Sequence, residues 1–227
     1  YCQKENLHYT YRLVFAPETI GSITYICQNL KHLQKHVKFG YTLTCLGDDR
    51  ALSYLATRLG NTFTDQVTQH CLRHLNPDFV QYSFLQRGSD ERQYCAPGVD
   101  LPIASIMRTK YGEFPEYHTS LDTLGDVVTP KGLAGGIQAL VTCIEAYEYN
   151  HHFKTNYLCE PQLGKRGLYP TLSTKETAAQ TRTMMNLIAY ADGNHSLLEI
   201  AEIIHQPIWV LYELCKTLLD KGVISKL

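Results

Sequence analysis

The stretch between residues 88 and 122 gathers charged side chains and one histidine along a path punctuated by Pro and Gly. Acidic residues followed by a histidine that hydroxyl groups flank are typical of a metal site or an acid/base site. Loops held by a rigid scaffold often carry such sites. The alternative is an irregular connection whose charges face water. The residues concerned are Asp90, Glu91, Arg92, Asp100, Arg108, Glu116, His118 and Asp122.

Two further acidic positions lie where predicted strands end. Glu18 stands between a predicted strand at 8–15 and a helix predicted to run from there to about residue 36. Asp48 follows a second predicted strand at 41–46. In an open α/β sheet, the carboxyl ends of the strands form the edge at which sites are built. The alternatives are an acid in a first helical turn, favoured by the helix dipole, and an ordinary Asp-rich turn.

The elements predicted to position these residues alternate between strand and helix. The helix predicted at 65–75, with Thr64 as its cap, carries His70 and His74 four residues apart. That spacing suits a metal ion, but it is more typical of an ordinary helix surface. Further strands are predicted at 51–59 and 79–84, and a helix at 130–149 has apolar residues at helical spacing, including Leu133, Ile137, Leu140, Val141 and Ile144. The order predicts an α/β fold, a mixed sheet covered by helices.

The bulk composition excludes several classes of protein. The formal net charge of the 227 residues is -1, which argues against a general nucleic-acid-binding surface. Hydrophobic residues make up 44%, enough for a sizeable core. The eight cysteines form no CxxC pair, and we interpret them as reduced thiols. Neither a signal peptide nor a membrane-spanning apolar run is visible, so a cytoplasmic protein without membrane contact is expected.

The pattern of residues along the sequence changes after residue 150. The predicted division is an α/β domain at 1–155, a linker at 156–170 and a winged helix-turn-helix domain at 171–227. In the last part, Ser196 and Glu199 form a predicted capping box. The helix in the recognition position begins with Pro-Ile-Trp, whereas helices that read DNA start with Arg, Lys, Asn or Gln. This favours docking on a protein over DNA binding. The sequence leaves open whether the chain forms a homo-oligomer.

Three segments carry a resemblance to a known family: RLVFAPETIGSI, GSDERQYCAPGVDLP and PEYHTSLD. The chain resembles aminopeptidase-like proteins that join a zinc-peptidase domain to a C-terminal winged helix. These are relatives of the bacterial zinc aminopeptidases, glutamate carboxypeptidase and glutaminyl cyclase. The resemblance covers nearly the whole chain, and it implies a zinc-exopeptidase-like fold with one or two zinc ions.

The resemblance also implies roles for individual residues. It makes His118 and Asp48 metal ligands, Tyr117 the donor that stabilises an oxyanion, and Asp90 part of the pocket. Glu18 becomes either the general base or, if the alignment shifts by one position, a ligand. Arg92 is our own addition, as a partner for a substrate carboxylate.

Two departures from the family pattern affect the expected activity. Thr19 stands where relatives carry a second glutamate, and the His and bridging Asp that relatives take from an upstream element are absent. A chain starting at Tyr1 is therefore expected to be a fragment. The leading interpretation is a zinc-dependent aminopeptidase-like hydrolase acting on a peptide or amide bond. The alternatives are an impaired pseudo-peptidase that binds a peptide or a sugar-linked ligand, and a winged-helix regulator.

Overall fold

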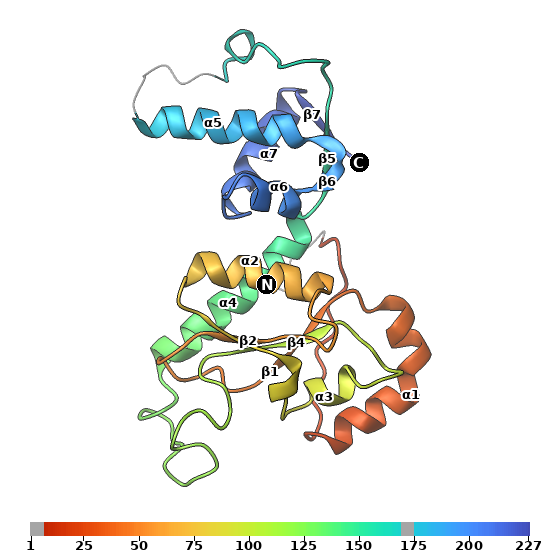
Figure 1. The fold of residues 1–227 in the computed structure, drawn as a ribbon, viewed down its shortest axis with the longest axis vertical. Helices are drawn as coiled ribbons and strands as arrows, with labels where there is room; N and C mark the ends of the chain where they lie inside the picture. The colour runs from red at the N-terminus through yellow and green to blue at the C-terminus, as the bar shows by residue number, and fades with distance from the viewer. Residues whose placement is uncertain (1–6, 169–174) are drawn as a thin grey trace. The chain divides into compact units, whose positions relative to one another are not determined.

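The computed structural model describes residues 7–168 and 175–227, and the chain divides into two compact units, Tyr1–Ile144 and Glu145–Leu227 (Figure 1). Each unit has its own sheet. Every helix among the described residues is too short or too polar to cross a lipid bilayer.

The first unit is built on a four-stranded mixed sheet, which confirms the predicted fold class. The strand order is β1 (Gly40–Leu43), β4 (Ile103–Met107), β2 (Ser53–Leu55) and β3 (Val80–Tyr82). β1 runs parallel to β4, β2 runs antiparallel to β4, and β3 runs parallel to β2. The loops that follow β1 and β4 therefore meet at one edge of the sheet, where they place Asp48 beside Thr109.

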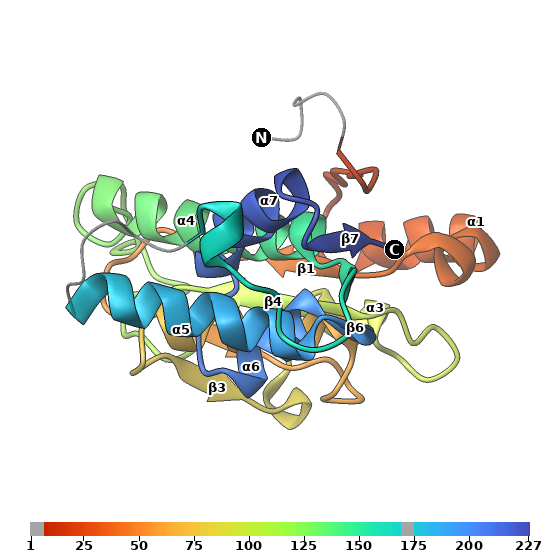
Figure 2. The ribbon, with the colours of Figure 1, turned by 90° about the horizontal axis from the view of Figure 1, so that it is seen from above.

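Side chains alternate between the two faces of this sheet, as the pleat requires. Tyr54 and Ile106 oppose each other on the face covered by α2 (Phe63–Leu75) and α4 (Pro130–Tyr149). Leu55 and Ser105 oppose each other on the other face, with α3 (Glu91–Tyr94) and α1 (Ile20–His36) beyond them. Figure 1 shows α2 and α3 on opposite sides of the strands, and Figure 2 shows α4 and α1 at opposite ends of the first unit. The sheet is thus the middle of three layers.

The helix α4 contacts the loop after β1 with glycines rather than with its large apolar residues. A Cβ atom at Gly132 would overlap the Gly47 carbonyl oxygen, and one at Gly136 would lie 2.7 Å from the Leu46 carbonyl oxygen. The large residues recur on a different side of the helix, and Leu133 and Ile137 are 44% and 61% exposed. The helical period of the apolar residues therefore predicted the helix but not the side that contacts the sheet.

The strand predicted at 8–15 is wrong. These residues are irregular, and Leu13 and Phe15 are 68% and 93% exposed. A strand needs a neighbour for its backbone hydrogen bonds, and among the described residues none pairs with this segment. In the stretch 88–122, by contrast, the Pro and Gly pattern predicts an irregular loop, whereas the structure contains the regular elements α3 and β4.

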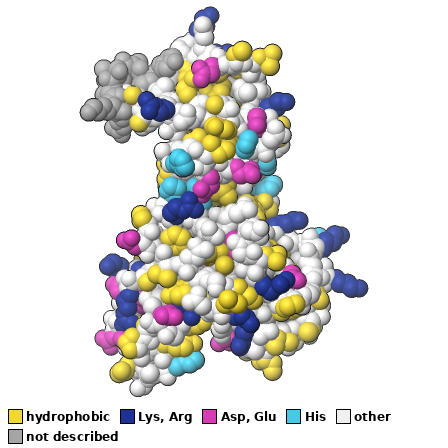
Figure 3. All heavy atoms as spheres, viewed as in Figure 1, with side chains coloured by type: hydrophobic (Ala, Val, Ile, Leu, Met, Phe, Trp, Pro, Cys, Tyr) yellow, Lys and Arg dark blue, Asp and Glu magenta, His cyan; other side chains and the backbone are white. Residues whose placement is uncertain are grey.

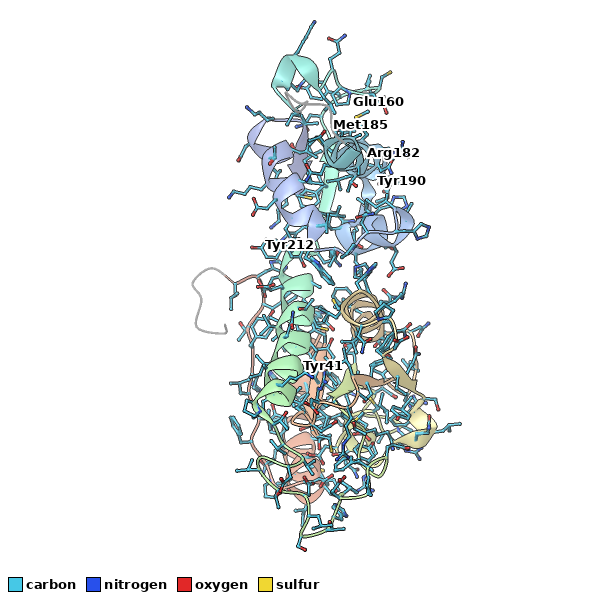
Figure 4. All side chains as sticks on the ribbon, turned by 90° about the vertical axis from the view of Figure 1, so that its left-hand side faces the viewer. Tyr41, Glu160, Arg182, Met185, Tyr190 and Tyr212 are labelled. Atoms are coloured by element: carbon cyan, nitrogen blue, oxygen red, sulfur yellow. The ribbon has the colours of Figure 1, made fainter. Side chains whose placement is uncertain are left out.

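The second unit has the architecture of a winged helix, as predicted. Its helices are α5 (Lys175–Tyr190), α6 (Leu197–Ile203) and α7 (Val210–Asp220). β5 (His152–Thr155) pairs with β6 (Asp192–Ser196) on one side and β7 (Ile224–Lys226) on the other, both antiparallel. The predicted capping box of α6 is present, with Ser196 and Glu199 satisfying each other's backbone N–H groups. Tyr212 of α7 stacks on Tyr149, with ring centroids 4.2 Å apart (Figure 4).

The division of the chain differs from the predicted one. β5 lies within the predicted first domain at 1–155, but it belongs to the second unit because it forms the centre of that unit's sheet. The predicted linker at 156–170 contains a short 3₁₀ helix, Gly164–Arg166. Residues 169–174, where the predicted linker ends and the predicted winged domain begins, lie outside the described residues.

Candidate active site

Glu18 is carried by a strained turn directly before α1. Thr19 has φ 64° and ψ -68°, and the Ile20 N–H donates to the Glu18 carbonyl oxygen at 2.8 Å. This is a γ-turn with positive φ, the rarer of the two γ-turn forms. Its backbone conformation is energetically costly for a β-branched residue. Such strain, about 1–3 kcal/mol, clusters at functional sites and must be held by surrounding contacts. We call Glu18, Thr19 and Ile20 the Thr19 turn.

Three side chains from the segment before and within α3 hold the Thr19 turn. Ser89 donates its hydroxyl to Glu18 Oε1 at 2.9 Å. Asp90 accepts the Thr19 N–H at 2.7 Å, and Arg92 donates to the Thr19 hydroxyl at 2.8 Å. The structure thus brings three of the predicted site residues, Glu18, Asp90 and Arg92, into one cluster. Here Asp90 and Arg92 bind the protein's own turn, and their role toward a substrate stays a prediction.

Glu91 supports this cluster through buried hydrogen bonds. The sequence alone predicts no role for Glu91 beyond that of a charged residue in a loop. Its side chain is completely buried, and one carboxylate oxygen accepts bonds from the Gly88 and Ser89 N–H groups and the Tyr111 hydroxyl, at 2.7–2.9 Å. The other oxygen accepts from Ser105 of β4 at 3.2 Å. A Glu placed just after Gly-Ser-Asp was the available signal, because a carboxylate there can cap the backbone N–H groups that precede it.

Asp48 lies at the sheet edge with its carboxylate already bonded. It is 4% exposed, and its two oxygens accept from the Thr109 N–H at 2.8 Å, the Thr109 hydroxyl at 2.6 Å and the Arg50 N–H at 3.0 Å. Buried polar groups in folded proteins are normally hydrogen-bonded, and these bonds give the Asp48 carboxylate a structural role. In this arrangement Asp48 joins the loop after β1 to the loop after β4.

Tyr117 and His118 lie on a loop that Arg50 fastens to the Asp48 turn. Arg50 makes two parallel bonds to the Glu116 carboxylate, both 2.8 Å, and this pairing lowers the pKa of Glu116. The His118 ring stacks on Tyr117, with centroids 3.9 Å apart, and the His118 backbone has φ 59°. His118 is therefore, like Thr19, in a strained backbone conformation, and its imidazole is exposed.

Cys45 lies among the acidic residues of the site and was not predicted. Burial raises the pKa of its thiol, and the negative charges of Asp122, Asp48 and Glu18 raise it further. Burial also raises the pKa of the Tyr117 phenol, with smaller effects of Cys45 and Glu18. Cys45 and Tyr117 both pack against the core formed by Leu55, Met107 and Tyr111. The thiol and the phenol are thus kept protonated at neutral pH.

Zinc does not fit the residues that the structure describes. In the described part of the chain, no three His, Cys, Asp or Glu side chains are grouped so that they could hold a metal ion. The Asp48 oxygens are occupied by hydrogen bonds, Glu18 is bonded to Ser89, and His118 is exposed. His70 and His74 form no such group either, and His70 is fully buried rather than on the helix surface.

Replacing Thr19 with glycine tests the strain in the turn. Without a Cβ atom the positive φ costs little, so the free energy of unfolding is expected to stay level or rise by up to about 1 kcal/mol, despite the lost Arg92 bond. The control Thr24→Gly, at a helical position in α1, is expected to lower it by roughly 0.5 kcal/mol. Urea unfolding measures both. A clear loss at position 19 alone would mean that the turn is not strained.

Two family profiles match the chain. The profile described as "Domain of unknown function (DUF4910)" matches residues 1–150, and one described as "winged helix-turn-helix" matches residues 151–226. The second match agrees with the three helices and three strands of the second unit. The first spans the whole candidate site.

Similar proteins include one from Clostridium acetobutylicum with the name "Putative polysaccharide biosynthesis protein with aminopeptidase-like domain", 39% identical over 195 residues. The match covers 85% of this chain and 44% of that protein. A crystal structure of a "putative peptidase" from Clostridium acetobutylicum has a TM-score of 0.87 and 33% identity, over 97% of this chain and 49% of that one. An aminopeptidase from Aneurinibacillus sp. strain AM-1 has a TM-score of 0.45 and 20% identity, over 57% and 30%.

The chain spans about half the length of these two Clostridium relatives. Together with the winged-helix match, they confirm the predicted resemblance to aminopeptidase-like proteins with a C-terminal winged helix.

Proposed function

We propose, starting from the fact that the chain belongs to the family described as domain of unknown function (DUF4910), that its first unit hydrolyses a peptide or amide bond at the Thr19 turn. One observation carries the proposal. Glu18 is held by Ser89 on a strained turn, close enough to Tyr117 for its charge to raise the pKa of that phenol. The printed names of the two Clostridium relatives, an aminopeptidase-like domain and a peptidase, support this class of reaction.

In the proposed mechanism, Glu18 acts as the general base. Its carboxylate takes a proton from a water molecule as the water oxygen bonds to the carbonyl carbon. It then gives that proton to the amine nitrogen as the C–N bond of the tetrahedral intermediate breaks, which re-forms the carbonyl group and releases the amine. The bond from Ser89 occupies one Glu18 oxygen and orients the other. Tyr117 is protonated at neutral pH, since its pKa lies above the ordinary value of 10.0, and it donates to the oxygen that becomes negative. Asp90 and Arg92 keep the turn in place.

Zinc, as one or two ions, is the cofactor that the resemblance to zinc aminopeptidases implies. Because the described residues do not group three ligands, the mechanism assigns no step to a metal ion. The activity assay is therefore run with zinc added and with zinc removed by a chelator.

The decisive variant is Glu18→Gln, which keeps the shape of the side chain but removes the base. Hydrolysis of leucine p-nitroanilide by the chain is expected to fall by about 10²–10⁴-fold in kcat. Glu113→Gln, at an exposed carboxylate of the same unit, is the matched control and should leave kcat unchanged. If Glu18→Gln retains wild-type activity, Glu18 is not the base.

A second candidate function is binding without hydrolysis. It is favoured by Thr19, which stands where relatives carry a carboxylate, and by the Asp48 oxygens, which are already bonded. The ligand would be a peptide or a sugar-linked molecule. A wild-type chain that hydrolyses nothing with or without zinc, yet binds leucyl-leucine or N-acetylglucosamine in calorimetry, would support this candidate.

For the second unit we propose docking on a protein surface rather than on DNA. Residues 145–227 contain eight Lys and Arg against nine Asp and Glu, so the unit lacks the basic excess that phosphate contacts need. On the face shown in Figure 3, both signs of charge are interspersed. Arg182, Met185 and Tyr190 project from α5 (Figure 4), and Val210 of α7 is also exposed. Binding to duplex DNA that weakens steeply with salt would contradict this proposal.

A further inference from the structure

The first unit contains a cavity of about 290 Å³ on the side of the sheet that α2 and α4 cover. Its apolar wall consists of Leu52, Leu75 and Ala139, and its polar wall consists of Asn76, Arg108 and Gln138. No Asp or Glu is among the lining residues. The Glu91 cluster that supports the Thr19 turn is bonded to Ser105, which faces the opposite side of the sheet. The cavity therefore lies on the other side of the sheet from the Glu91 cluster and the Thr19 turn, and it is joined to the Asp48 turn only through Arg108.

Arg108 brings a cationic group with spare donors to this cavity. Its side chain makes one hydrogen bond within the described part of the protein, from Nε to the Asp48 carbonyl oxygen at 2.8 Å. A guanidinium carries five N–H donors, so the two terminal nitrogens keep theirs for a ligand. The bond at Nε also fixes the plane of the guanidinium. A Cβ atom at Gly135 would lie 2.9 Å from Nη1, so the glycine leaves the space that the group occupies.

Two amides add neutral donors beside the guanidinium. The Asn76 Oδ1 atom accepts the Asp78 N–H at 3.1 Å, which leaves the Nδ2 donors of Asn76 without a partner among the described residues. Gln138 is exposed on α4, and its amide has no hydrogen bond to any other described residue. One positive charge, two amides and an apolar wall together suit a singly charged anion with a small apolar body.

We propose that this cavity binds a small organic carboxylate. The two carboxylate oxygens would accept from Nη1 and Nη2 of Arg108 in the bidentate geometry that guanidinium favours. The body of the ligand would lie over Leu52 and Leu75, within donor reach of Asn76 and Gln138. A carboxylate fits better than a phosphate because a single guanidinium balances one negative charge. The proposal does not depend on the proposed hydrolysis.

The test compares two probes that differ only in the charged group. N-acetyl-leucine carries a carboxylate, and N-acetyl-leucinamide carries a neutral amide in its place. In isothermal titration calorimetry of the full chain, the acid is expected to bind at least about tenfold more tightly than the amide, as for hydrogen bonds to a charged group. Inorganic phosphate is the third probe, and it is expected to compete only weakly with the acid.

Variants then locate the site. Arg108→Met is expected to weaken binding of N-acetyl-leucine at least about tenfold. Gln138→Leu, at an exposed helical position that tolerates the change, should weaken it severalfold. Gly135→Ala should weaken it by displacing the guanidinium. Arg87→Met, the same substitution at an exposed position of the first unit outside the cavity, should leave the affinity unchanged.

Several results would overturn the proposal. They are equal binding of acid and amide, no binding of the acid to the wild-type chain, and tighter binding of phosphate than of the acid. Unchanged affinity in Arg108→Met would also overturn it. If Arg108→Met does not fold, unchanged affinity in both Gln138→Leu and Gly135→Ala would overturn it instead.

Discussion

Replacing Gly132 with alanine is expected to destabilise the first unit by at least about 3 kcal/mol, at the upper end of overpacking effects. Gly→Ala inside a helix normally stabilises by about 1 kcal/mol, so the expected sign is reversed here. The reason is the contact between α4 and the loop after β1. The added Cβ atom would overlap the Gly47 carbonyl oxygen and lie 2.5 Å from that of Asp48. Both neighbours are backbone atoms, which cannot rotate away as a side chain can.

Urea unfolding followed by circular dichroism measures this effect. Leu133→Ala and Ile137→Ala are the controls, because these neighbouring side chains are largely exposed and their loss should cost less than about 1 kcal/mol. The Gly132 variant should also loosen the Asp48 turn, which hydrogen exchange at the Thr109 N–H would report. A Gly132→Ala chain as stable as wild type would show that α4 does not lie this close to the sheet.

Glu91→Leu is the second substitution with a large expected effect, a loss of roughly 3–5 kcal/mol in the free energy of unfolding. The fully buried carboxylate accepts bonds from Gly88, Ser89, Ser105 and Tyr111. Leucine would leave these donors buried without an acceptor, at about 1–3 kcal/mol for each one that water does not reach. Glu91→Gln keeps one acceptor oxygen and should cost less. Because the backbone N–H of Ser89 is one of the donors, the hydrolysis proposed for the Thr19 turn should fall as well.

The matched control is Glu113→Leu. The wild-type Glu113 side chain is about half exposed, and its carboxylate pairs only loosely with Lys110, at 3.8 Å. It should change the free energy of unfolding by less than about 1 kcal/mol. Equal losses in the two variants would contradict the role assigned to Glu91.

The Glu91 cluster also predicts a pH dependence on the alkaline side. Burial, followed by the hydrogen bond to Glu91, raises the pKa of Tyr111 above its ordinary value of 10.0. The unfolded chain then loses this proton at a lower pH than the folded one, so stability is expected to decline as the pH rises above 10. Tyr111→Phe should remove this part of the decline, and urea unfolding between pH 8 and about 11 would measure it.

Part of the candidate site could be predicted from local signals. The end of a predicted strand points to Asp48, which the structure places at the sheet edge, and a Pro- and Gly-rich stretch points to His118. Glu18 follows the predicted strand at 8–15, which does not form, so the local signal for it rested on a wrong prediction. Glu91 and Cys45 could not be recognised in this way. Their roles depend on partners brought in by the fold, such as Ser105 and Tyr111 around Glu91 and the charges of Glu18 and Asp122 around Cys45.

The sequence by itself determined the long helices, the capping box at Ser196, the winged helix and the α/β class, because these depend on residue spacing within one segment. Only the tertiary structure decided which side of α4 meets the sheet, since the glycines at 132 and 136 matter through the backbone opposite them. It also decided that residues 8–15 form no strand, because strand pairing requires a neighbour that no local pattern specifies. The tertiary structure likewise decided the strained conformation of Thr19, because the side chains that hold this turn, Ser89, Asp90 and Arg92, are distant in the sequence.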